Sequence, residues 1–98
     1  MYSNFYFIQI VPELRFNRIK LGYAGSLQSR LSQHRTTSPT ANILKSWKCK
    51  ISWEAAAIDA VSNCGILIGG EVYDFSNLEK AILIADKFFN LLLNKDSD

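Results

Sequence analysis

Apolar and polar positions in the first half of the chain follow the pattern of a small antiparallel sheet. Residues 4–11 are aromatic and β-branched, and Pro12 ends them because proline cannot donate to a sheet ladder. A short polar turn leads to residues 16–23, so we expect these two segments to form a hairpin. Residues 41–51 alternate between apolar and basic side chains towards their end, which predicts a third strand with one buried and one basic face.

Helical spacing predicts the next elements. Ser26 is a typical N-terminal cap, and the helix after it carries Leu27 and Leu31 one turn apart as a buried stripe. A second helix is expected over residues 53–63, capped by Ser52.

The last third of the chain predicts a long helix over residues 76–94. Ser76 and Glu79 have the spacing of a capping box, in which each side chain binds a free backbone amide of the first turn. Before it, residues 65–70 form a glycine-bracketed loop or a short strand, and residues 71–75 a brief extended segment. The order of elements predicts an α+β fold, a three-stranded antiparallel sheet flanked by helices, with all 98 residues in one domain.

The long helix has more apolar positions than one buried stripe requires. The additional apolar residues are Leu83, Ile84, Phe88 and Leu91. Two arrangements remain open: the sheet covers all of them, or a second copy of the chain covers the surplus and forms a homodimer through this C-terminal helix.

Composition narrows the class of protein. Cys49 and Cys64 fit neither a disulfide-rich scaffold nor a zinc site, which needs closely spaced ligands. The longest apolar segment, residues 81–93, is interrupted by Asp86 and Lys87 and is too short to cross a bilayer. No secretory signal is apparent at the N-terminus. These features predict a cytoplasmic protein that does not enter a membrane.

The net charge of +2 conceals a division between the two halves of the chain. Eight basic residues and one acidic residue lie up to Lys50, whereas three basic and eight acidic residues follow from Ile51 onward. This asymmetry favours an anionic partner for the first half, although a merely solvated, dipolar surface would also account for it.

Two side chains with useful chemistry lie on the first helix. Arg30 and His34 are one turn apart and share a face with Leu27 and Leu31. Because the leucines must dock on the sheet, Arg30 and His34 flank the docked stripe and can reach across the sheet edge. The glycine in the second strand, Gly22, marks a place where another group approaches closely.

The positions of these residues resemble a known family. In order and spacing the chain is similar to the GIY-YIG nuclease superfamily, in particular to a branch common in phages whose second tripeptide reads Lys-Ile-Gly. The resemblance covers about residues 4–90. The segments that carry it are Tyr6-Phe7-Ile8, Lys20-Leu21-Gly22, Arg30 with His34, Thr37-Ser38-Pro39 and Gly70-Glu71-Val72-Tyr73.

The resemblance implies a divalent-metal-dependent endonuclease that hydrolyses phosphodiester bonds in DNA with Mg²⁺ or Mn²⁺. It implies that Tyr6 activates or orients water and that Arg30 stabilises phosphate charge. It further implies that His34 transfers a proton or contacts phosphate. Gly22 would leave room for the sugar-phosphate backbone.

Two family positions differ here or need a choice. The second family tyrosine is replaced by Lys20, a cation that binds phosphate but serves as a base only if its pKa is lowered. The family's metal-binding glutamate is assigned to Glu54, on the inward line of the second helix. An alternative register would place it at Ala56 or Ala57 and leave the protein without its metal ligand. Glu71 is a further candidate ligand.

Residues with a predicted role in binding nucleic acid are Gly22, Arg35, Lys45, Lys48 and Lys50. The three lysines are expected on the polar face of the third strand, where they could follow a phosphate backbone or be simply solvated. Two alternatives to the nuclease remain: a catalytically degenerate nucleic-acid-binding module, and a protein-interaction module that uses the last helix.

Overall fold

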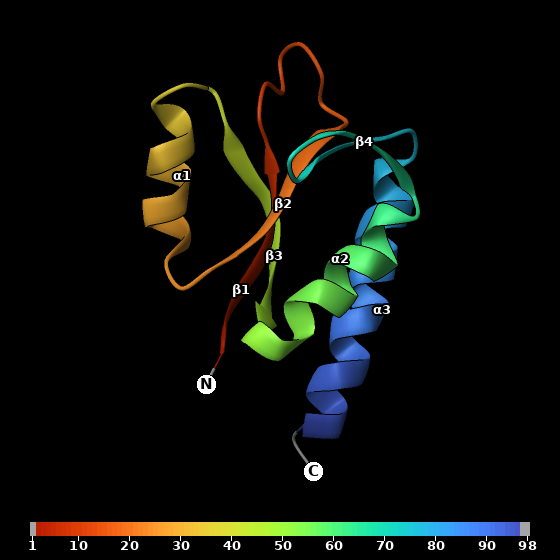
Figure 1. Cartoon of the computed structure of the whole chain (residues 1–98). Helices are drawn as coiled ribbons and strands as arrows, with labels where there is room; N and C mark the ends of the chain where they lie inside the picture. Colours follow the sequence, from red (N-terminus) through yellow and green to blue (C-terminus); the bar gives the residue numbers. More distant parts are fainter. Residues whose placement is uncertain (1, 97–98) are drawn as a thin grey trace.

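The protein folds as a five-stranded antiparallel sheet with helices on both faces (Figure 1). The computed structural model describes residues 2–96. The spatial order of the strands is β3-β1-β2-β5-β4. Their bounds are β1 (Ser3–Gln9), β2 (Arg18–Ala24), β3 (Asn42–Cys49), β4 (Gly65–Gly69) and β5 (Val72–Phe75).

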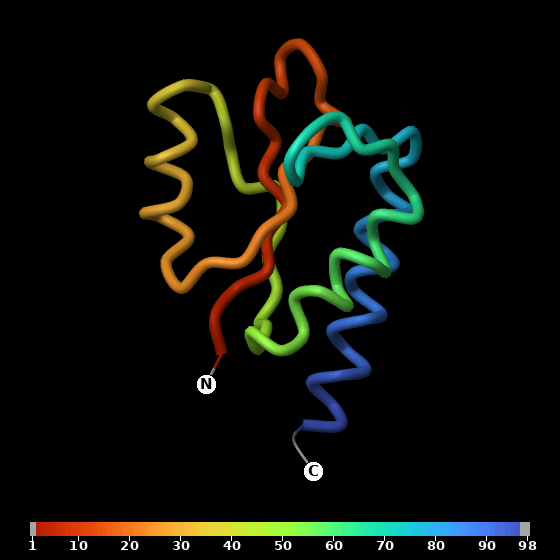
Figure 2. The backbone as a smooth tube through the Cα atoms, in the orientation of Figure 1, coloured from red at the N-terminus to blue at the C-terminus, as the bar shows by residue number. Residues whose placement is uncertain are grey.

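Helices occupy the two sides of the sheet unequally. The helix α1 (Leu27–Arg35) lies alone on one side, and α2 (Glu54–Ser62) and α3 (Leu78–Asp96) lie together on the other (Figure 1). A short 3-10 helix, η1 (Ile51–Trp53), connects β3 to α2. The backbone trace shows β1 passing between the single helix and the helix pair (Figure 2). No helix within residues 2–96 combines the length and the apolar character needed to cross a membrane.

The predicted three-stranded sheet is wrong, because a second hairpin extends it. Strands β4 and β5 pair with each other, and β5 then pairs with β2 through Arg18 opposite Asp74. Gly70, in the turn between them, has a φ of 56°, a left-handed conformation that glycine adopts without a steric penalty. Both strands are short, and β4 reads Gly-Ile-Leu-Ile-Gly, so the alternation of apolar and polar residues that identifies a strand is missing.

Strand β1 is central, and its side chains build a core on each face. Phe5 and Phe7 point towards α2 and α3, where Phe89 is among the residues that complete the larger core. Tyr6 and Ile8 point to the other face, under α1. These four side chains of β1 are fully buried, which explains the uninterrupted apolar stretch in the sequence.

The helix α1 covers only part of its side of the sheet. Leu27 and Leu31 pack against Tyr6 and Ile8, as the sequence predicts, and α1 lies mainly over β1 and β3. The same side of β2, β5 and β4 therefore has no helix over it. Side chains alternate along a strand, so every second residue of β2, from Arg18, points to this side. Arg18 and Lys20 are partly exposed there, whereas Tyr6 covers Gly22.

Of the three N-terminal helix caps predicted from the sequence, the structure confirms one. The Ser26 Oγ accepts a hydrogen bond from the Ser29 amide at 3.2 Å and so caps α1 as expected. Ser52 lies inside η1, and α2 begins without a side-chain cap. At α3 the Asn77 Oδ1 accepts from the Lys80 amide at 3.1 Å, so Asn77 takes the position expected of Ser76.

Candidate functional site

The phenol ring of Tyr6 lies across Gly22 of the neighbouring strand. The two residues are paired in the β1–β2 register. A Cβ atom placed on Gly22 would lie 2.2 Å from the Tyr6 hydroxyl oxygen, far inside van der Waals contact. The space expected to admit a sugar-phosphate backbone is therefore filled by Tyr6, and Gly22 is needed to place the phenol.

Arg30 approaches this phenol from α1. Its Nη1 donates a hydrogen bond to the Tyr6 hydroxyl at 3.3 Å. Burial raises the pKa of Tyr6 above its ordinary value of 10.0, although the neighbouring guanidinium opposes the shift. The phenol therefore stays protonated at neutral pH. It accepts from Arg30 and holds the guanidinium in place.

His34 lies one helical turn beyond Arg30 and close to Lys20. Burial, followed by the positive charges of Lys20 and Arg30, lowers the pKa of His34 below 6.5. The imidazole is therefore neutral at pH 7 and able to accept a proton. The structure thus brings together Tyr6, Lys20, Arg30 and His34 from β1, β2 and α1.

Two carboxylates lie near this group. The Glu71 Oε1 is 3.8 Å from the Lys20 Nζ, in a partly exposed ion pair. Glu54, the first residue of α2, is half-buried and has no hydrogen bond or ion pair with any other residue in 2–96. Burial is the largest cause that raises the pKa of Tyr6, and the charges of Glu71 and Glu54 add smaller contributions in the same direction. Each carboxylate therefore lies within electrostatic range of the phenol.

The sequence leaves two positions open for the family's glutamate: Glu54, or a position at Ala56 or Ala57. Ala57 is fully buried in the core, whereas Ala56 is exposed to solvent. Burial, followed by the Glu54 charge, raises the pKa of the Cys49 thiol to about 11. The charge of Glu54, the acidic residue at the start of α2, therefore acts on both the Cys49 thiol and the Tyr6 phenol.

The donor chemistry of the site is compatible with Mg²⁺. Within residues 2–96, no three side chains of His, Cys, Asp or Glu gather as a preformed metal site. Magnesium is commonly held by one or two carboxylates, with water and substrate phosphate completing the shell. Glu54 and Glu71, which each act electrostatically on Tyr6, are the two carboxylates that could supply such a ligand.

The residues predicted to bind nucleic acid do not form one surface. Lys45 Nζ pairs with Asp86 at 2.7 Å and Lys50 Nζ with Asp96 at 2.8 Å, so both lysines contact α3. Lys48 is exposed on the α1 side of β3, opposite Asn4. The face expected to be buried also ends early, because Ile51 is 65% exposed.

Arg35, the remaining residue predicted to bind nucleic acid, is hydrogen-bonded to a nearby backbone carbonyl. Its Nε donates to the carbonyl oxygen of Ala41 at 2.8 Å. This bond ties the end of α1 to the start of β3. The other guanidinium nitrogens have no hydrogen bond or ion pair to the described part of the chain.

Sequence reasoning missed an ion pair on the open face of the sheet. Arg18 Nη2 lies 3.4 Å from the Asp74 Oδ2, and the buried Arg18 Nε has no partner within residues 2–96. Arg18, Lys20 and Gly22 occupy every second position of β2 and so share this face. This alternation was the sequence signal that places Arg18 on the same face as Lys20 and Gly22. The pairing of Arg18 with Asp74 could not be predicted from the sequence, because it depends on β5 joining the sheet.

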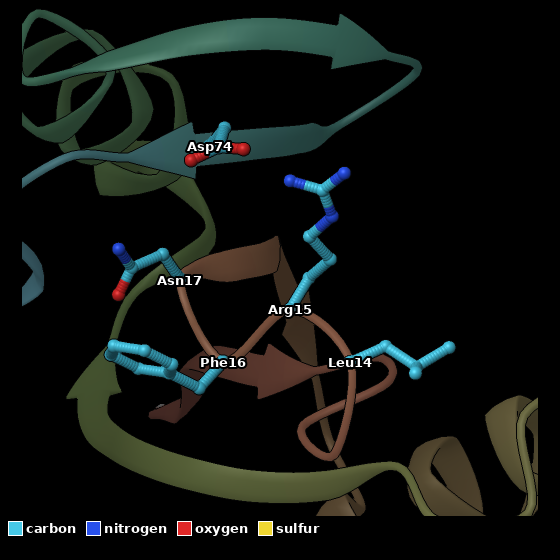
Figure 3. Close-up of a pocket in the computed structure, with 5 residues that line it drawn as sticks. All are labelled: Leu14, Arg15, Phe16, Asn17 and Asp74. Carbon is cyan, nitrogen blue, oxygen red and sulfur yellow. The ribbon is translucent and has the colours of Figure 1, made fainter.

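A separate pocket of about 240 Å³ lies beyond the N-terminal end of β2 (Figure 3). Its lining residues are Leu14, Arg15, Phe16 and Asn17 of the β1–β2 loop and Asp74 of β5. Tyr6, Arg30 and His34 are not part of it. It shares only Asp74, through the Arg18 ion pair, with the open face that leads to them.

Comparisons with known proteins add no relative. No family model, no curated protein and no solved structure matches the chain. The resemblance to GIY-YIG nucleases therefore stays a prediction from the sequence.

Proposed function

We propose that the protein is a divalent-metal-dependent endonuclease of the GIY-YIG type that cleaves DNA. The observation that carries the proposal is the hydrogen bond from Arg30 to Tyr6 above Gly22, with Lys20 and His34 beside it. Two cations and a neutral imidazole around one point suit a phosphodiester, which needs charge stabilisation and a proton acceptor.

Arg30 and Lys20 are the proposed phosphate-binding groups. A planar guanidinium donates two parallel hydrogen bonds to phosphate oxygens, and the Tyr6 hydroxyl fixes its orientation. Lys20 contributes a second positive charge. Its contact with Glu71 is long and partly exposed, so a phosphate can replace the carboxylate at little cost.

Tyr6 is proposed to act through Arg30. Its side chain has 0% exposure, so it does not reach solvent water in this structure. This differs from the water-activating role that the family resemblance implies. Tyr6 is therefore assigned here as a positioning residue, and His34, partly exposed and neutral at pH 7, as the group that accepts a proton from the attacking water.

Glu54 is the proposed main ligand for Mg²⁺ or Mn²⁺, with Glu71 as a second carboxylate. When bound, the cation would supply positive charge to the phosphate oxygens and lower the pKa of a coordinated water. The carboxylate of Glu54 has no other ion-pair or hydrogen-bond partner among the described residues, so binding a cation breaks no existing contact.

Plasmid nicking tests the proposal. Supercoiled DNA should be nicked by the wild type with Mg²⁺ and left intact with EDTA. Arg30→Ala should lower the nicking rate by about 10²–10³, because it removes a donor to the transition-state charge. Lys87→Ala, on the exposed side of α3, is the matched control and should nick normally. Equal rates for Arg30→Ala and the wild type would contradict the proposal.

A non-catalytic DNA-binding module is the second candidate, favoured by the cations on the open face of β2. Binding through Arg18 and Lys20 does not need Glu54. Each phosphate contact contributes about one unit to the slope of log K against log salt, so Lys20→Ala should reduce that slope by about one. Lys45→Ala should leave it unchanged, since Lys45 pairs with Asp86. Such binding without nicking would select this second candidate.

A homodimer through α3 would have to use a small apolar area. Ile84 and Phe88 pack against the core, whereas Leu83 and Leu91 are exposed two turns apart. Sedimentation velocity over a range of concentrations distinguishes the two arrangements. A dimer that Leu91→Ala dissociates would support a role for this helix in self-association.

A further inference from the structure

The pocket beside the β1–β2 loop combines exposed apolar groups with polar groups, two of which have no partner within residues 2–96. Leu14 is 76% exposed and Phe16 62%, although large apolar side chains are usually buried. In Figure 3 the Arg15 guanidinium extends towards the strand that carries Asp74, while the Phe16 ring lies on the side of Asn17.

Two polar side chains of this pocket, Arg15 and Asn17, are available to bind a ligand, and among the described residues Asp74 keeps one oxygen free. Neither the Arg15 guanidinium nor the Asn17 amide makes a hydrogen bond or ion pair with another residue in 2–96. Asp74 accepts from Arg18 through one oxygen only, at 3.4 Å. The pocket therefore offers amide donors and an acceptor, a carboxylate, a cation and an exposed aromatic face within one small space.

These groups match the chemistry of a nucleobase. A base has a flat face that stacks on an aromatic ring and an edge of hydrogen-bond donors and acceptors. The volume of about 240 Å³ is below the range of roughly 300–1,000 Å³ typical of drug-sized ligands, which suits a single ring system. The adjacent Arg15 and Arg18 provide positive charge for the phosphates that accompany a base.

The position of the pocket relates it to the candidate site. Arg18, Lys20 and Gly22 follow each other on the same side of β2, and the four steps from Arg18 to Gly22 rise by about 13 Å. Successive nucleotides of one strand in a duplex are separated by about 3.4 Å along the axis. A strand with one phosphate at Arg30 would thus reach the pocket about four nucleotides away.

We propose that this pocket binds one unpaired nucleobase of a DNA substrate, stacked on Phe16. In a continuous duplex the faces of a base are stacked and its edge is paired, so only an unpaired or extruded base can use both the ring and the polar groups. The protein therefore prefers DNA with an unpaired base near the bond it cleaves. The inference rests on the proposed function for its DNA ligand and is independent of cleavage.

Binding to two matched duplexes in EDTA tests this inference. One duplex is fully paired, and the other carries a single-nucleotide bulge of the fluorescent base 2-aminopurine. We expect tighter binding and quenched fluorescence with the bulge. Phe16→Ala should weaken binding to the bulged duplex about five- to tenfold, the lower range for loss of one stacking contact, and leave the paired duplex unaffected.

Two further variants separate stacking from general loss of apolar surface. Phe16→Tyr keeps the ring and should retain the preference for the bulge. Leu83→Ala removes an exposed leucine from α3 and should change neither affinity. Phe16 is exposed, so its replacement should leave the circular dichroism spectrum unchanged.

The outcomes distinguish this inference from the proposed nuclease. If Phe16→Ala weakens both duplexes equally, or neither, the nucleobase pocket is overturned even when the wild type nicks plasmid. A preference for the bulge that requires Phe16 supports the pocket even when no nicking occurs. A wild type that binds neither duplex at low salt overturns the pocket together with the DNA ligand.

Discussion

Tyr6 and Gly22 show how one missing side chain positions a functional group. The phenol occupies the space that a Cβ on Gly22 would need, and from there it accepts a hydrogen bond from Arg30. The sequence indicates that something approaches Gly22 closely. It does not indicate which group, because the pairing register between β1 and β2 is set by the tertiary structure.

Replacing Gly22 by alanine should destabilise the protein. The new methyl group would force the Tyr6 ring to move in a packed core, at a cost of about 1–3 kcal/mol. Urea unfolding measures the loss, and nicking should fall with it as Arg30 loses its support. Gly69→Ala is the matched control, since no atom lies within 4 Å of the added Cβ. Equal stability of Gly22→Ala and the wild type would contradict the account of the phenol.

The single histidine allows a direct test of the electrostatics. Burial, Lys20 and Arg30 lower the pKa of His34, so its NMR titration should have a midpoint below 6.5. Removing one cation with Lys20→Ala should move the midpoint upward. Because the folded state binds the proton less tightly than the unfolded state, this group should reduce stability as the pH falls below 6.5. A midpoint above 6.5 would show that His34 lies elsewhere.

Secondary structure was predictable where periodicity was strong and long. The first helix, with Ser26 as its cap and Leu27 and Leu31 docked on the sheet, follows directly from the sequence. The pairing of β4 and β5 within the sheet does not, because both strands are short, and β4 is largely exposed and carries no alternation. Arg30 and His34 were predictable together for the same reason as α1, since helical spacing alone places them on one face.

The capping residue of α3 is Asn77 in the structure, whereas the sequence pattern predicts Ser76. Asn77→Ala should lower the free energy of unfolding by about 1 kcal/mol, because it removes the acceptor for the Lys80 amide. Ser76→Ala should have little effect. Thermal denaturation of both variants checks the assignment, and the opposite order of stabilities would restore the capping box expected from Ser76 and Glu79.

At the scale of the whole molecule, incomplete coverage of the sheet by helices leaves the candidate functional face accessible. The helix α1 lies over β1 and β3, whereas β2, β5 and β4 are open on that side. Arg18 and Lys20 therefore lie partly exposed on this side of β2, while Lys45 and Lys50 pair with α3. The first half of the chain carries the excess of basic residues. The fold pairs two of them with acidic residues of α3, and composition cannot indicate this pairing.

The rate of Mg²⁺-dependent nicking by Glu54→Gln shows whether a carboxylate of α2 acts with Arg30 of α1 and Tyr6 of β1. The substitution keeps the shape of the side chain and removes its charge. We predict a rate at least about a hundredfold below wild type, as for loss of a main electrostatic contributor, while Glu79→Gln on α3 nicks normally. A Glu54→Gln variant that nicks at the wild-type rate would contradict the account.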